Sequence, residues 1–145
     1  MNVVDSSGWL EYFSGGQNSD KFEIPLKDSS SLIVPVITIY EVFKVVLREA
    51  GENEALQVIA SMQKGSVIEL NTSIAMNASR ISLKYSLPMA DSIILSTAQS
   101  YGAVIWTQDS DFENLPNVNF FQKLRADNNK INGKTPANNL LQVTA

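Results

Sequence analysis

The sequence contains no cysteine and no histidine, and these two absences exclude several kinds of chemistry. Without cysteine there is no disulfide framework and no thiolate metal site, a composition compatible with a reducing cytoplasm. Without histidine the triads built on an imidazole base are excluded, and zinc would have only carboxylate ligands, which is an uncommon set. The composition leaves open the oxygen ligation of a hard cation such as Mg²⁺ or Mn²⁺.

Long apolar runs and an excess of positive charge are also missing. No segment approaches the roughly 18 apolar residues that a membrane span needs, and residues 1–5 lack the features of a signal peptide. We therefore expect a cytoplasmic protein that does not associate with membranes. The formal net charge of -4 gives little long-range attraction for nucleic acid, so a polyanionic substrate would need a local cationic feature. A bound divalent metal would supply one.

The length of 145 residues fits one domain, and a domain of this size buries roughly 68 to 70% of its unfolded surface. The C-terminal residues differ in composition from the rest. They are rich in asparagine and contain a turn sequence, Gly133-Lys134-Thr135-Pro136. We predict a domain at residues 1–125 and a polar C-terminal extension at residues 126–145.

Short apolar runs alternate with segments of helical periodicity. The runs predicted to be buried strands are residues 1–4, 32–34, 67–70, 104–107 and 118–121. Apolar stripes at helical spacing lie between them, one ending at Gly51 and another ending at Gly102. This alternation is typical of an α/β fold with a mainly parallel sheet covered on both faces.

Acidic residues recur at the edges of these apolar segments. Asp5 follows the first strand, and Asp109 follows the fourth. Glu41 lies near the start of one helix, and Asp91 lies in the first turn of another. Strand ends and helix starts share one crevice in an open parallel α/β sheet, so these acids are predicted to converge. Mutual repulsion would raise some of their pKa values unless divalent cations compensated for it, so such a cluster implies metal.

Each acid taken alone also has a structural explanation. Asp5 is placed to cap the first helix, and Asp109 and Asp111 can cap a short helix after the fourth strand. The helix dipole favours a carboxylate at Asp91. Glu41 can lie on an exposed helix flank beside the apolar stripe. The joint pattern is therefore more specific than any of its members.

At these residues the sequence resembles the PIN-domain nucleases, and most of all the VapC-type toxin ribonucleases of toxin-antitoxin pairs. The resemblance covers residues 1–125 and lies in segments that occur in family order: Val3-Val4-Asp5-Ser6-Ser7-Gly8-Trp9, Ile39-Tyr40-Glu41-Val42, Ala90-Asp91-Ser92-Ile93-Ile94 and Trp106-Thr107-Gln108-Asp109-Ser110-Asp111-Phe112. It implies a five-stranded parallel sheet with an acidic metal-binding pocket at the carboxyl ends of its strands.

The resemblance also implies roles for individual residues. The catalytic and metal-binding acids would be Asp5, Glu41, Asp91 and Asp109. Ser6 and Thr107 would be polar supports, and Asp111 would be an additional acid, with Asp109 favoured as the one nearer the metal. The implied activity is hydrolysis of RNA phosphodiester bonds with Mg²⁺ or Mn²⁺, and the implied partners are a small antitoxin and a second copy of the chain.

Two other functions are compatible with acids at strand ends. A receiver-like domain that accepts a phosphoryl group on aspartate would also use Mg²⁺. Against it, the third strand run is followed by Asn71 and Thr72 with no aspartate to accept phosphate. A non-catalytic module would keep the fold only to bind RNA or protein, and the complete set of acids argues against it.

Overall fold

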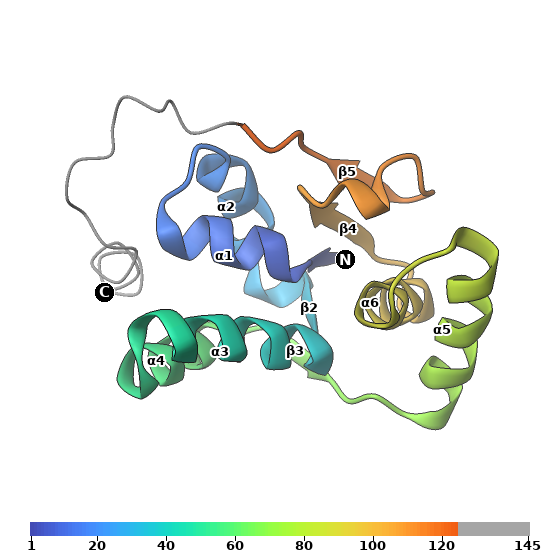
Figure 1. The fold of residues 1–145 in the computed structure, drawn as a ribbon, viewed down its shortest axis with the longest axis horizontal. Helices are drawn as coiled ribbons and strands as arrows, with labels where there is room; N and C mark the ends of the chain where they lie inside the picture. Colours follow the sequence, from blue (N-terminus) through green and yellow to red (C-terminus); the bar gives the residue numbers. More distant parts are fainter. Residues whose placement is uncertain (125–145) are drawn as a thin grey trace.

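Five parallel strands form the centre of the computed structural model, which describes residues 1–124 (Figure 1). The sheet order is β3-β2-β1-β4-β5, and every neighbouring pair is parallel. The strands are β1 (Asn2–Val4), β2 (Leu32–Pro35), β3 (Ser66–Ile68), β4 (Val104–Thr107) and β5 (Val118–Phe120). The predicted α/β fold with a parallel five-stranded sheet is confirmed, and each strand overlaps a predicted apolar run.

Six α-helices and two short 3-10 helices connect the strands. They are α1 (Ser6–Ser14), α2 (Ser19–Lys27), η1 (Ser29–Ser31), α3 (Val36–Ala50), α4 (Glu52–Met62), α5 (Thr72–Tyr85), α6 (Met89–Ser100) and η2 (Ser110–Phe112). Gly15 ends α1 in the left-handed conformation, with φ of 67°, which glycine adopts without a steric penalty. The helix that carries Glu41 starts directly after β2, so Glu41 lies in its second turn.

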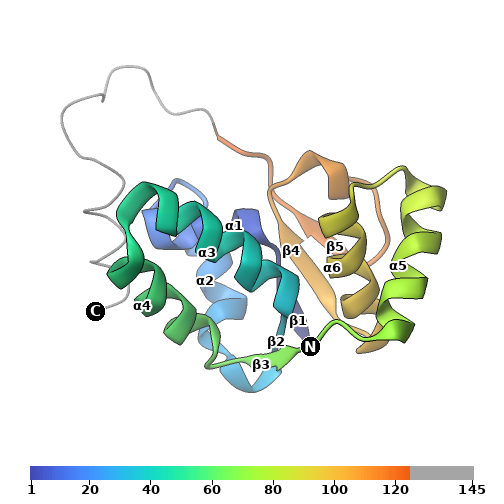
Figure 2. The same cartoon turned by 60° about the horizontal axis from the view of Figure 1, so that its bottom comes forward.

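Helices cover both faces of the sheet, and each face has its own apolar core. Val4 and Val34 belong to a core shared with α1, α2, α3 and α4, whereas Val3 and Ile33 belong to one shared with α5 and α6. Figure 2 shows these two groups of helices on opposite sides of the strands. Consecutive strand residues contribute to opposite cores because side chains alternate across a strand.

The start of α1 packs closely against β1, and Gly8 makes this approach possible. A Cβ atom at Gly8 would lie 2.6 Å from Val4 Cγ1 and 2.8 Å from the Phe22 ring. Overpacking of this kind costs roughly 1 to 3 kcal/mol. Because Gly8 has no side chain, the first turn of α1 and the preceding Asp5 can lie close against the sheet.

None of the helices among residues 1–124 is long and apolar enough to cross a membrane. The C-terminal extension predicted at residues 126–145 lies outside the described residues.

Candidate functional site

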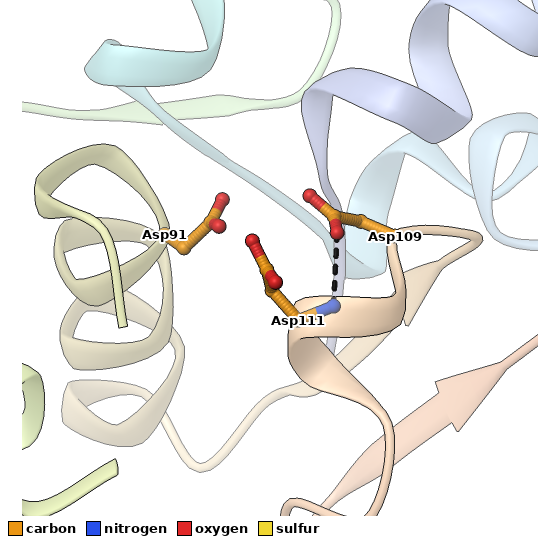
Figure 3. A group of neighbouring side chains, drawn as sticks. All are labelled: Asp91, Asp109 and Asp111. Carbon is orange, nitrogen blue, oxygen red and sulfur yellow. Dashed lines mark hydrogen bonds between the residues drawn. The ribbon is translucent and has the colours of Figure 1, made fainter. Parts of the chain in front are cut away.

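Three carboxylates meet at the carboxyl edge of the sheet. Asp91 comes from the first turn of α6, and Asp109 and Asp111 come from the segment after β4. One oxygen of each lies within 4.8 Å of the others, and Figure 3 shows the three side chains directed toward a common space. The Asp111 N–H donates to Asp109 Oδ1 at 2.9 Å, so a tight turn presents both side chains to Asp91.

Asp5, the residue between β1 and α1, is almost fully buried, with 2% of its surface exposed. Its Oδ1 atom accepts hydrogen bonds from the Ser7 hydroxyl at 2.7 Å and from the Gly8 N–H at 3.0 Å. The bond from Gly8 caps α1, as the sequence predicted. Among residues 1–124, Oδ2 accepts one hydrogen bond, from Thr107, and a carboxylate oxygen has two lone pairs. One lone pair on Oδ2 thus remains for a cation or a water molecule.

The pKa of Asp5 is raised to about 6 because burial disfavours the charged carboxylate. The hydrogen bonds from Thr107, Ser7 and Gly8 oppose this effect, and repulsion from Asp109 adds to it. With a pKa of about 6, Asp5 is mostly deprotonated at pH 7 and becomes protonated as the pH falls below about 6.

Thr107 links Asp5 to Asp109. Its hydroxyl donates to Asp5 Oδ2 at 2.7 Å and accepts from the Asp109 N–H at 2.9 Å. Thr107 is fully buried at the end of β4, where its side chain has little freedom to move. This contact fixes the position of the Asp109 backbone relative to the carboxylate of Asp5.

Glu41 approaches the site from α3. It is partly buried, and its Oε1 atom accepts a hydrogen bond from the Ser6 hydroxyl at 2.6 Å. Ser6 and Glu41 thus connect the start of α1 to α3. Glu41 and Asp5 are not members of the three-carboxylate group, although both are near enough to affect the pKa of Asp91.

The pKa of Asp91 is raised to about 7, the larger of the two raised acid values. Burial is the main cause, followed by repulsion from the neighbouring carboxylates Asp109, Asp5, Glu41 and Asp111. Acids that are far apart in the sequence thus act electrostatically on one carboxyl group.

The chemistry of these side chains fits a hard divalent cation. All the donors are carboxylate oxygens, which Mg²⁺ and Mn²⁺ prefer. The ion pairs within residues 1–124 are Glu23 with Lys27 and Arg48 with Glu49, so no basic side chain there pairs with the site acids. A cation at the centre of the group would remove the repulsion that raises the pKa of Asp91.

A second polar network supports the segment that carries Asp109. The Gln108 side chain, 7% exposed, donates to Glu11 Oε2 at 2.7 Å and accepts from Asn18 Nδ2 at 3.0 Å. Asn18 also donates its backbone N–H to Glu11 Oε1 at 3.3 Å and its side-chain N–H to the Gln122 carbonyl at 3.1 Å. This network was not predicted from the sequence, because its members show no common spacing. The only available signal was the position of Gln108 between Thr107 and Asp109.

A polar cavity of about 570 Å³ lies next to the acids. It is lined by Ser7, Gln108, Asp109, Ser110, Glu113, Phe120, Gln122 and Lys123. The site therefore consists of a carboxylate cluster and an adjacent space large enough for part of a substrate.

The sequence matches the family model of the PIN domain over residues 3–118. The chain belongs to the PIN-domain family. Solved structures share the fold: a toxin-antitoxin complex from Klebsiella pneumoniae superposes with a TM-score of 0.70 at 21% identity, covering 81% of this chain and 95% of that chain. No curated protein matches the sequence.

Two further solved structures are similar. One is VapC20 of Mycobacterium tuberculosis, described as a toxin that cleaves the sarcin-ricin loop, with a TM-score of 0.66, 14% identity and coverage of 77% of this chain and 92% of that chain. The other is a DNA-bound VapBC complex from Salmonella typhimurium, with a TM-score of 0.63 and 16% identity. The match covers 83% of this chain and 96% of that chain. At these identities the similarity shows the fold.

Proposed function

We propose that this protein is a metal-dependent endoribonuclease that hydrolyses RNA phosphodiester bonds. The observation that carries the proposal is the group formed by Asp91, Asp109 and Asp111 at the carboxyl edge of a PIN fold, with Asp5 and Glu41 beside it. Neither histidine nor cysteine is present to act as a base or nucleophile, and the carboxylate oxygens of this group favour water activated at an oxygen-ligated ion.

In this proposal Asp91, Asp109 and Asp111 hold Mg²⁺ or Mn²⁺. Asp5 contributes its free lone pair, directly or through water, and Glu41 completes the negative rim. A bound divalent ion supplies Lewis-acid polarisation of the phosphate and acidifies a water molecule. The role of Thr107 and Ser6 is to hold Asp5 and Glu41 in fixed orientations, so that the carboxylates need not reorganise during the reaction.

The similar structures support a toxin with a protein partner. One of them is a toxin-antitoxin complex, and another is a DNA-bound complex of the VapBC type. We propose that this protein is the toxin of such a pair, acts on RNA in the cytoplasm and is bound by a small antitoxin.

A homodimer is also proposed. An apolar groove of about 570 Å³ lies between α5 and α6, and its lining includes the exposed side chains of Leu83 and Met89. Exposed apolar surface of this kind is typical of protein contacts. Light scattering after size-exclusion chromatography would give the mass of the assembly.

The receiver-like alternative has little support. β3 lies at the edge of the sheet, and the side chain of Asn71, which follows it, accepts a hydrogen bond from the Ile74 N–H at 2.9 Å as the N-cap of α5. The non-catalytic alternative predicts RNA binding that is equal with and without EDTA, and no cleavage with any divalent metal. The cleavage experiment therefore also separates this alternative from the proposal.

The proposal is tested with the substitution Asp91→Asn, which keeps the size of the side chain and removes one anionic ligand. Cleavage of a mixed RNA pool in Mn²⁺ or Mg²⁺ is followed by gel electrophoresis. We expect the variant to be slower by about 10²-fold or more, because deleting one electrostatic catalytic group has an effect of this size.

Two controls accompany this measurement. EDTA should abolish cleavage by the parent protein, and Glu69→Gln, which changes an exposed acid after β3, should leave the rate unchanged. If Asp91→Asn cleaves RNA as fast as the parent in the presence of metal, the proposal is wrong.

The domain boundary is part of the proposal. The family match ends at residue 118, and the described residues 1–124 contain two apolar cores, one on each face of the sheet. We propose residues 1–125 as the nuclease domain and residues 126–145 as a polar extension of it.

A further inference from the structure

We propose that the polar cavity beside Asp109 binds one nucleobase of single-stranded RNA, next to the phosphate that is cleaved, and that it favours a base whose edge donates hydrogen bonds. This inference rests on the proposed ribonuclease function. It adds a specificity site to the chemistry of the acids, with Glu113 as the residue that selects the base and Phe120 as the residue on which the base stacks.

The polar cavity lies directly beside the carboxylate group, and residues of the site line it. Asp109 belongs to the carboxylate group and also lines the cavity, and Ser7, which donates to Asp5, lines it as well. The volume of about 570 Å³ lies within the roughly 300 to 1,000 Å³ of small-molecule sites. A nucleotide bound here would lie directly beside the carboxylates, so its own or the adjacent phosphate can reach them.

Phe120 gives the cavity an aromatic surface. It is the last residue of β5 and pairs in register with Thr107, the residue that bonds both Asp5 and Asp109. Its side chain is partly exposed rather than sealed in the core. Single-stranded RNA is commonly held by stacking of unpaired bases on aromatic side chains. Phe120 can serve in this way one strand away from the acids.

The remaining lining residues have polar groups available for a base edge. The side chains of Ser110, Glu113 and Gln122 make no hydrogen bond with another residue within 1–124, although all three line the cavity. A carboxylate has only acceptor oxygens, so Glu113 favours bases that present N–H groups. Guanine presents two adjacent N–H groups on its Watson–Crick edge, which match the two oxygens of a carboxylate. Lys123 places an ammonium group at the same cavity, where it can offset the repulsion between an RNA phosphate and the acids.

The experiment maps cleavage sites in a random single-stranded RNA pool by sequencing, with Mn²⁺ present. The parent protein should cut beside guanosine in preference to the other nucleosides. Glu113→Gln should lose this preference by about 10-fold, because a hydrogen bond to a charged group has an effect of this size. Phe120→Leu should raise KM by about 10-fold with every base, because stacking is tolerant of sequence. The control Glu69→Gln should match the parent in both respects.

A chemical substitution in the RNA keeps the test independent of protein folding. Inosine lacks the exocyclic amino group of guanosine, so replacing the guanosine at the preferred position should slow the parent protein. The same replacement should have little effect on Glu113→Gln, which has already lost the second acceptor. Thermal unfolding of each variant identifies any that fail to fold.

Binding of a short fluorescent RNA in Ca²⁺ buffer is measured in parallel, so that the subsite is tested without turnover. Guanosine-selective binding that depends on Glu113, without cleavage, would reject the nuclease and leave the subsite. Cleavage with no base preference, or with the same preference in Glu113→Gln and the parent, would overturn the subsite and leave the nuclease.

Discussion

At the scale of single residues, Asp91 is the acid whose pKa is most affected by the other carboxylates of the site. Its carboxyl group lies in the first turn of α6, where the helix N-terminus favours negative charge. Burial and the surrounding carboxylates have the opposite effect and raise its pKa to about 7. The protein thus holds a group of like charges whose repulsion is relieved by a bound cation or by protonation.

Asp111 gives a prediction at this scale. Because one of its oxygens lies within 4.8 Å of ligand atoms of Asp91 and Asp109, we expect it to bind the ion together with them. Asp109→Asn and Asp111→Asn should each weaken Mn²⁺ binding by about 10-fold or more, as measured by isothermal titration calorimetry.

The control for this prediction is Asp20→Asn, an exposed acid on α2. It should bind Mn²⁺ as the parent does. Unchanged affinity for Mn²⁺ in Asp111→Asn would show that Asp111 does not bind the ion. Asp109 would then be the only metal ligand from the segment after β4.

At the scale of secondary-structure elements, Gln108 joins the end of β4 to α1 and to the segment before α2. Its amide donates to Glu11 on α1 and accepts from Asn18. Asn18 in turn reaches the carbonyl of Gln122 after β5. The start of the segment that carries Asp109 and Asp111 is therefore held by α1 and by the residues before α2, and we expect the geometry of the segment to depend on this network.

Exchanging the side chains of Glu11 and Gln108 tests whether this network positions the acids. In Gln108→Glu a carboxylate would face the carboxylate of Glu11, so we expect lower thermal stability and slower cleavage. In the double variant Glu11→Gln with Gln108→Glu the amide and the carboxylate change places. Residue 108 then accepts from both Asn18 and residue 11, and residue 11 still accepts from the Asn18 N–H.

We expect the double variant to recover most of the melting temperature and cleavage rate, as in a double-mutant cycle. Circular dichroism melts and initial cleavage rates at saturating Mn²⁺ measure the two quantities. A double variant no better than Gln108→Glu would show that the hydrogen bonds of Gln108 do not position the acids.

The same scale shows what the sequence could and could not predict. The strands were predictable because each overlaps a short apolar run of the sequence, and α1, α3 and α6 because their apolar residues recur at helical spacing or follow such a run, and each ends near a glycine. The start of α3 was less clear, since residues 36–39 continue the apolar run of β2. The network of Glu11, Asn18 and Gln108 was not predictable, because it depends on tertiary contacts between residues that are far apart in the sequence.

At the scale of the whole molecule, the parallel topology explains why the acids meet. β1 and β4 are neighbours in the sheet, so Asp5 and the segment of Asp109 emerge side by side at the carboxyl edge. The sequence motifs predicted that acids would gather there. They named Asp111 only as an additional acid and favoured Asp109 as the one nearer the metal. The place of Asp111 beside Asp91 and Asp109 depends on the short helix η2 and on the hydrogen bond from the Asp111 N–H to Asp109.

This arrangement predicts how stability depends on pH in the absence of metal. The pKa values of Asp5 and Asp91 are raised to about 6 and about 7, so between about pH 4 and pH 7 the folded state binds more protons than the unfolded state. Stability contributed by these groups is therefore lost as the pH rises through this window. In EDTA the melting temperature should fall from about pH 4 to about pH 7, and less steeply in Asp91→Asn.

Mn²⁺ should reverse this fall, because it binds the deprotonated carboxylates and so stabilises the folded state most at the higher pH. Differential scanning calorimetry at each pH, with and without Mn²⁺, measures the effect. Stabilisation by Mn²⁺ that is as large in Asp91→Asn as in the parent would place the ion elsewhere.

The most direct test of the account is the position of a bound ion. Crystals of the full chain grown with Mn²⁺ should show an anomalous scattering peak in contact with oxygens of Asp91, Asp109 and Asp111, with Asp5 bound directly or through a water molecule. A structure in which these oxygens point to separate regions of the surface, with no manganese among them at saturating concentration, would contradict the account.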